Sequence, residues 1–93
     1  APVRVAAGIQ NKVLVAMGCG IPVVLTTLIS RAIPELVDES NCIIRDEAAT
    51  TAEACLRLMN QPEFRTNMAR AGYNMVKQYY GWEEKLRNYV LEK

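Results

Sequence analysis

Within residues 9–27 the sequence changes from a helical pattern to a continuous apolar run. Apolar residues recur at helical spacing up to Gly18 and Gly20, either of which can form a left-handed C-terminal cap. Pro22 then opens VVLTT, which predicts a buried strand, because proline can begin a strand but not lie inside one. A helix followed at once by an apolar strand is typical of α/β domains.

The rest of the chain repeats this alternation. Residues 2–6, with Val3 and Val5, predict a strand or an extended entry segment. The other predicted elements are a helix over 9–17, a short helix around 34–37, a strand at CIIRD (42–46), a helix opened by a capping box at 50–53, a helix from Pro62, and a last helix after Gly81 that carries Trp82, Leu86, Tyr89 and Val90 on one face. Helical spacing selects as inward stripes Ile9, Val13, Ala16 and Met17, then Ala52, Cys55, Leu56 and Met59, and then Phe64, Met68, Ala71, Met75 and Tyr79.

This order of elements predicts the fold class. It is α/β, a Rossmann-like half-domain with a short parallel sheet, flanking helices and a helical C-terminal tail. We treat residues 1–93 as a single domain. Doubly wound domains have more than two strands, so we expect the chain to be part of a larger domain whose other strands precede Ala1.

Composition excludes several classes of function. The three cysteines have no CxxC spacing and the chain contains no histidine, so we expect no metal site and a reducing, cytoplasmic compartment. The net charge of +1 gives no field that would attract nucleic acid. The longest apolar run, 21–29, is too short to span a bilayer.

The polar residues of 8–12 stand at the expected start of the first helix. Unpaired backbone amides and the helix dipole attract anions at such a position, and Lys12 adds a charge, which predicts a phosphate site. The alternative is a turn at Gly8 followed by a solvated face. At 100° per residue, one sector of this helix holds Gly8, Asn11, Lys12, Val15 and Cys19.

A family resemblance rests on these residues. The stretch PVRVAAGIQNKVLVAMGCGIPVV, with ELVDESNCII, the break at Pro62 and YYGWEEK, resembles the C-terminal part of the nucleotide-sugar-binding domain of family 4 (group 1) glycosyltransferases. The nearest variants read GxxNKxLEAMAxGxPVV. The resemblance implies the two-domain GT-B fold and the transfer of a hexose from a nucleotide sugar, with retention, as in bacterial polysaccharide biosynthesis. It also implies a cytoplasmic enzyme, in full length peripheral at the inner membrane face.

The resemblance also implies the residues of the donor site. The donor diphosphate would lie over 8–12, and the substrate-binding residues would be Gly8, Ile9, Gln10, Asn11, Lys12, Val15 and Thr26. Thr26 has an alternative role, as a hydroxyl that caps the next turn. The family has two glutamates eight residues apart, of which the second holds the donor ribose; here Ala7 and Val15 occupy these positions.

No catalytic residue can be assigned in this sequence. Catalysis would need an N-terminal acceptor domain, no cofactor is expected beyond the nucleotide-sugar substrate, and the fragment alone would be inactive. The loss of the carboxylate at Val15 motivates a second hypothesis, a degenerate, non-catalytic module that acts in protein assembly. The apolar face of the last helix would then support weak self-association.

Overall fold

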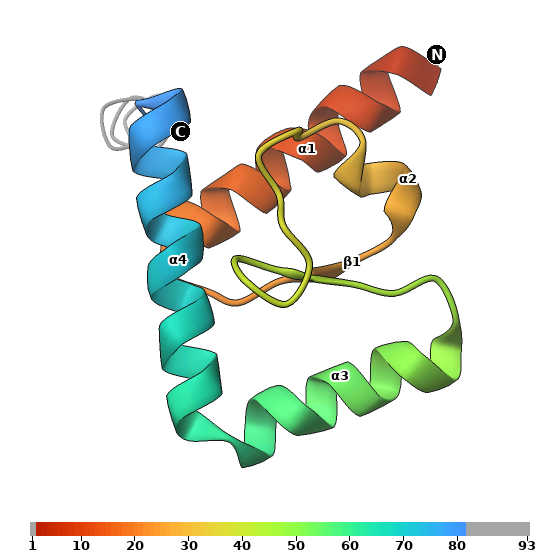
Figure 1. The fold of residues 1–93 in the computed structure, drawn as a ribbon. Coiled ribbons are helices and arrows are strands. Elements are labelled where there is room, and N and C mark those ends of the chain that lie inside the picture. Colours follow the sequence, from red (N-terminus) through yellow and green to blue (C-terminus); the bar gives the residue numbers. More distant parts are fainter. Residues whose placement is uncertain (1, 82–93) are drawn as a thin grey trace.

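The chain begins in a long helix. The computed structural model describes the backbone of residues 2–81 and the side chains of residues 8–81 (Figure 1). Helix α1 spans Pro2–Gly18, so the predicted strand at 2–6 and the predicted helix start at Ile9 are both wrong. Proline suits the first helical position because its missing N–H would have no partner there, and Ala6 and Ala7 are strong helix formers. These preferences outweigh the β-branched residues that suggested a strand.

The end of α1 matches the prediction from the glycines. Ile21 N donates to Ala16 O and Gly20 N donates to Met17 O, both at 3.0 Å. These two bonds define a Schellman motif, and Gly20 has the left-handed φ of 76° that this motif needs. The chain then turns directly into the first strand.

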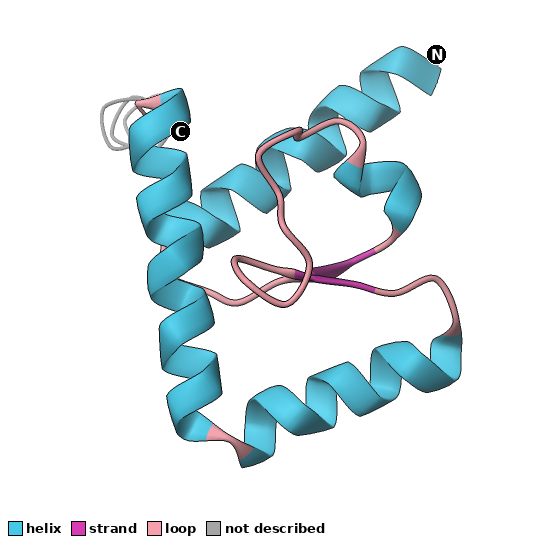
Figure 2. Ribbon diagram, in the orientation of Figure 1, coloured by secondary structure: helices cyan, strands magenta, loops and turns pink. Residues whose placement is uncertain are grey.

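Two short strands form a parallel sheet. β1 (Val24–Leu25) pairs with β2 (Ile43–Ile44), with Val24 opposite Ile43 and Leu25 opposite Ile44 (Figure 2). In Figure 1, α1 lies above the strands, α3 lies below them, and α4 runs along one side. The predicted α/β class, a short parallel sheet with flanking helices, is therefore confirmed.

The short helix between the strands lies earlier than predicted. α2 spans Thr27–Ser30, whereas the segment around Pro34 forms turns. Thr26 explains the shift, because its backbone is extended and its Oγ1 accepts a hydrogen bond from Ile29 N.

The last two described helices differ in how well the sequence predicted their first residues. α3 (Ala48–Asn60) starts before the predicted capping box, and the hydroxyls of Thr50 and Thr51 donate to Glu47 O instead of capping amides. α4 (Pro62–Tyr80) starts at its proline as predicted. It ends at Gly81, whose φ is 54°, which confirms the predicted break there. The predicted last helix lies outside the described residues.

Two apolar clusters form the core, and α4 contributes to both. The first contains Leu14, Met17, Ile33, Met75 and Val76. The second contains Ile43, Ala54, Leu58 and Met68. Met17, Met68 and Met75 are inward as predicted, but Tyr79 is exposed and its neighbour Tyr80 packs on the first cluster and donates to Glu35.

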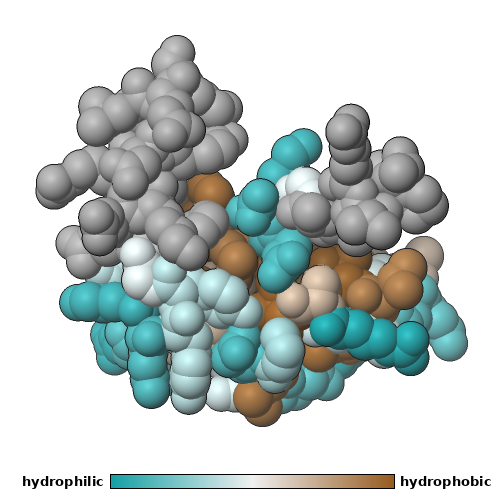
Figure 3. Space-filling model, turned by 90° about the horizontal axis from the view of Figure 1, so that it is seen from above, coloured by the Kyte–Doolittle hydropathy of each residue, from teal (hydrophilic) through white to brown (hydrophobic). Residues whose placement is uncertain are grey.

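The predicted inward stripe of α3 is wrong. Leu56 is 55 % exposed and Met59 is 69 % exposed, whereas Ala54 and Leu58 are buried. Both faces of this helix carry apolar residues, so periodicity alone could not choose between them. Seen from above, apolar side chains come to the surface between polar ones on the described part of the molecule (Figure 3).

A glycine allows α4 to approach α1 and the loop before β2. A Cβ at Gly72 would lie 3.1 Å from Met17 Cε and 3.3 Å from the carbonyl oxygen of Asn41. Asn41 is itself buried, and its side chain bonds to the backbone of this loop. The loop is therefore held on one side by its own asparagine and on the other by α4. None of the helices within 2–81 is both long and apolar enough to span a membrane.

Candidate functional site

The side of α1 that faces away from the core carries a hollow of about 490 Å³. It is lined by Gly8, Asn11, Lys12, Val15, Ala16, Cys19 and Ile21. Five of these seven residues are the sector that helical rotation selects from the sequence. The volume lies within the range of small-molecule sites, roughly 300 to 1,000 Å³.

The rotation of α1 is fixed by its buried side. Leu14 and Met17 are 2 % and 1 % exposed, and Val13 packs against them. Sequence reasoning missed Leu14 and placed Ala16 in the core, although Ala16 lines the hollow. The error is a small rotation about the helix axis.

Among the described residues, the hollow combines one cation, one amide and an apolar wall. Lys12 and Asn11 are exposed, and within residues 8–81 no carboxylate forms an ion pair with Lys12. The ammonium group can therefore attract an anion, and the Asn11 amide can donate to or accept from a neutral group. Val15, Ala16 and Ile21 provide an apolar surface against which the rest of a ligand can pack.

Backbone amides do not contribute to this site in the way the sequence suggested. Gly8 to Lys12 lie inside α1, where each amide donates to the carbonyl four residues earlier. The predicted helix entrance at Gly8 is therefore wrong, and an anion in the hollow would be held by side chains.

Three of the predicted substrate-binding residues lie elsewhere. Gln10 is on the core side of α1, where its Nε2 donates to Ala32 O at 3.0 Å. Ile9 is half-buried and does not line the hollow. Thr26 is also outside the hollow, and its hydroxyl caps α2, which is the structural role left open above. The structure thus brings together Gly8, Asn11, Lys12 and Val15.

The carboxyl end of the sheet is occupied by protein groups. Asp46, which follows β2, accepts from Thr27 N at 2.8 Å and from Thr27 Oγ1 at 2.7 Å. These hydrogen bonds lower the pKa of the Asp46 carboxyl group. An anionic ligand would meet this carboxylate at the start of α2, so the site on α1 is the better candidate.

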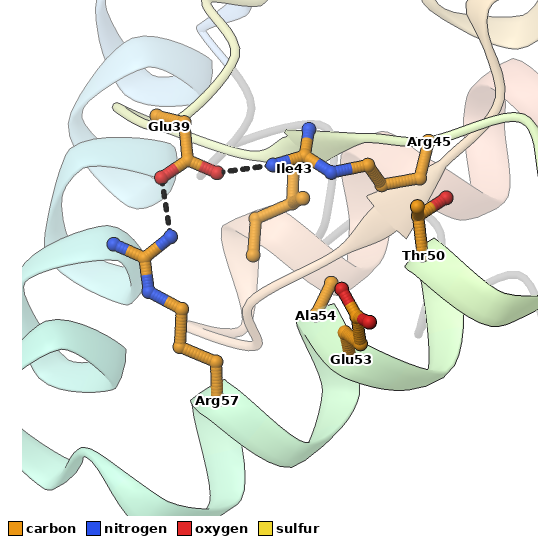
Figure 4. Close-up of a pocket in the computed structure, with 7 residues that line it drawn as sticks. All are labelled: Glu39, Ile43, Arg45, Thr50, Glu53, Ala54 and Arg57. Carbon is orange, nitrogen blue, oxygen red and sulfur yellow. Dashed lines mark hydrogen bonds and ion pairs between the residues drawn. The ribbon is translucent and has the colours of Figure 1, made fainter.

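A second, smaller hollow of about 140 Å³ lies between β2 and α3 (Figure 4). Glu39 bridges two arginines there, at 2.6 Å to Arg45 and 2.5 Å to Arg57. Arg45 also bonds both carboxylate oxygens of Asp38, and Arg57 stacks 3.8 Å from the ring centroid of Phe64. Both arginines are bonded to protein carboxylates, and these ion pairs hold the loop before β2 against α3. Sequence spacing gave no sign of it.

The described residues hold three free cysteines, of which Cys19 and Cys55 are exposed and Cys42 is buried. Burial raises the pKa of the Cys42 thiol to about 11, so this cysteine stays protonated. No group of three metal-binding side chains occurs within 2–81.

The fold and the hollow together define an α/β domain whose candidate site, among the described residues, carries one lysine. A family model identifies the family more closely. The model described as glycosyl transferases group 1 matches residues 1–61, and the chain therefore belongs to this family. Neither a curated protein nor a solved structure matches the chain.

Proposed function

We propose that the chain is the donor-side part of a group 1 glycosyltransferase and that the hollow on α1 binds the diphosphate and ribose of a nucleotide sugar. The observation that carries this proposal is the grouping of Gly8, Asn11, Lys12 and Val15 around one hollow, in a member of this family. Lys12 would contact the diphosphate, and the wall formed by Val15 and Ile21 would pack against the nucleoside.

Catalysis would need a second domain. The described residues beside the hollow include no carboxylate or histidine that could act as a general base, so an acceptor domain of the same polypeptide would face the hollow and supply the acceptor hydroxyl. The hexose would then pass from the nucleotide to that hydroxyl. This part of the proposal follows from family membership.

A second function is favoured by Val15. In the family a glutamate at this position holds the ribose, whereas here the wall of the hollow is apolar. A module without this carboxylate would bind a donor weakly and act in protein assembly instead. The two functions differ in whether a nucleotide sugar binds at all.

Calorimetric titration of the chain with UDP-glucose and GDP-mannose tests the proposal. We expect saturable binding of at least one donor, and Lys12→Gln should weaken it roughly tenfold to a hundredfold, because a hydrogen bond to a charged group contributes about 1.5 to 3 kcal/mol. Lys77→Gln is the matched control, since Lys77 is exposed on α4 and should leave binding unchanged. Binding that is equally strong in Lys12→Gln, or absent for every donor, would overturn the assignment.

A further inference from the structure

The hollow on α1 is polar at one end and apolar at the other. Asn11 and Lys12 lie at the polar end, and both are exposed. Val15 follows about one helical turn later, and Cys19 follows one turn after Val15, with its N–H still donating to Val15 O at 3.0 Å. Side chains spaced in this way along a helix are about 5 to 6 Å apart. Ile21, beyond the cap, extends the apolar end, so a ligand with its phosphates at Lys12 contacts apolar surface in this direction.

The apolar end offers few hydrogen-bond acceptors. Among the described residues that line the hollow, Asn11 has the only side-chain oxygen. The nearby carbonyl oxygens are already bonded, because Val15 O accepts from Cys19 N at 3.0 Å and Ala16 O accepts from Ile21 N, also at 3.0 Å. The Cys19 thiol is only a weak donor and acceptor. A hydroxyl group placed here therefore leaves water without gaining a good partner.

We propose that the preferred donor of this hollow is a thymidine diphosphate sugar, whose pentose lacks the 2′-hydroxyl and whose base carries a methyl group. This inference rests on the proposed function, in which the diphosphate contacts Lys12 and the nucleoside packs against Val15 and Ile21. In that arrangement the pentose lies at Val15, one turn from the phosphates, and the base lies toward Cys19 and Ile21.

The first part of the inference concerns the pentose. Val15 is half-buried in the wall of the hollow, and its side chain neither donates nor accepts a hydrogen bond. Burying a hydroxyl against such a surface is unfavourable, because its hydrogen bonds to water are lost and not replaced. A 2′-deoxyribose has one hydroxyl fewer to bury than a ribose. The deoxynucleotide should therefore bind more tightly.

The second part concerns the base. No described side chain at the apolar end is placed to read the edge of a base through strong hydrogen bonds, so a base with many polar edge groups, such as guanine, loses more hydration than a pyrimidine. Ile21 is 53 % exposed and can cover additional apolar surface. The 5-methyl group of thymine supplies such surface, and burying it should strengthen binding about twofold to fourfold.

Calorimetric titration of the 93-residue chain with UDP, dUDP and dTDP tests this preference. UDP and dUDP differ only in the 2′-hydroxyl, and dUDP and dTDP differ only in the methyl group. We expect dUDP to bind about fivefold more tightly than UDP, and dTDP to bind about twofold to fourfold more tightly than dUDP. UDP should still bind, because all three ligands share the phosphate contacts.

Three variants assign the preferences to their residues. Val15→Glu should reverse the first preference, so that UDP binds more tightly than dUDP, because a carboxylate accepts from the 2′-hydroxyl. Ile21→Ala should remove most of the gain from the methyl group and keep the ratio of UDP to dUDP. Lys12→Gln is the matched control, since it should weaken all three ligands by the same factor. If circular dichroism shows that Val15→Glu is unfolded, Val15→Thr, which has nearly the shape of valine, should narrow the difference between UDP and dUDP.

The outcomes separate this inference from the proposed function. If UDP binds as tightly as dUDP or more tightly, or if the folded Val15 variant leaves the ratio unchanged, the inference is overturned, while the diphosphate site stands because a nucleotide still binds. Equal affinity for dUDP and dTDP would overturn the placement of the base at Ile21 and with it the preference for thymidine. If none of the three ligands binds, the proposed function is overturned together with this inference.

Discussion

Replacing Asn41 with alanine is expected to lower the free energy of unfolding by about 2 to 3 kcal/mol. The Asn41 side chain is 8 % exposed. Its Oδ1 accepts from Val37 N at 2.8 Å and its Nδ2 donates to Glu35 O at 3.0 Å. Alanine would leave both backbone groups without their partner at a site that water reaches poorly, and each such loss costs about 1 kcal/mol or more.

The position of this loop makes the effect larger than that of a surface turn. The loop leads directly into β2, and the Asn41 carbonyl lies where α4 approaches at Gly72. For a chain of this size, 2 to 3 kcal/mol is a large part of a total stability of about 5 to 15 kcal/mol. Urea denaturation followed by circular dichroism measures the change.

Ser40→Ala is the matched control. Ser40 is the exposed neighbour of Asn41 and lies in the same loop, so its replacement should change the stability by about 0.5 kcal/mol or less. If Asn41→Ala were no more destabilising than Ser40→Ala, the asparagine would not hold the loop as described.

Local signals in the sequence predicted the ends of elements well. The glycine cap after α1, the proline start of α4 and the break at Gly81 each depend on one or two residues with a special backbone preference. The apolar runs that became β1 and β2 were also recognisable. Parallel pairing followed from the order of helices and strands.

Features that depend on tertiary contacts, such as which face of a helix is buried, could not be predicted from local sequence signals. The sequence of α3 has apolar residues on two faces, and only contact with Ile43 and Met68 selects Ala54 and Leu58 as the buried pair. The start of α1 was misplaced because β-branched residues in 2–6 suggested a strand. Helix propagation from Pro2 overrides that preference.

In the candidate site, too, some features follow from local sequence and others depend on tertiary contacts. One helical sector, from Gly8 to Cys19, could be identified from rotation alone and lines the hollow. The role of Gln10 depends on its hydrogen bond to Ala32 O, a contact between distant residues that sequence spacing does not reveal. The role of Thr26 depends on a local hydrogen bond from Ile29 N.

Val15→Glu is expected to raise affinity for a nucleotide sugar roughly tenfold to a hundredfold. Val15 is half-buried in the wall of the hollow, about one helical turn from both Asn11 and Lys12. A carboxylate there can accept hydrogen bonds from the ribose hydroxyls, and such a charged bond contributes about 1.5 to 3 kcal/mol. The dissociation constant for UDP-glucose or GDP-mannose, measured by calorimetry, gives the result.

Val15→Gln separates the charge from the added length. Glutamine has a similar shape but a neutral amide, so it should raise affinity less than glutamate does. A dissociation constant that Val15→Glu leaves unchanged would contradict the placement of the ribose against this part of α1.

A nucleotide sugar is proposed to bind along the outer face of α1. The most direct measurement is a map of backbone amide chemical shifts during titration of the isotope-labelled chain with UDP-glucose and GDP-mannose. We expect saturable shifts that centre on Gly8, Asn11, Lys12, Val15 and Cys19, whereas Thr26 and Asp46 should change little. Shifts centred on Thr26 and Asp46, or no shifts with either donor, would contradict it.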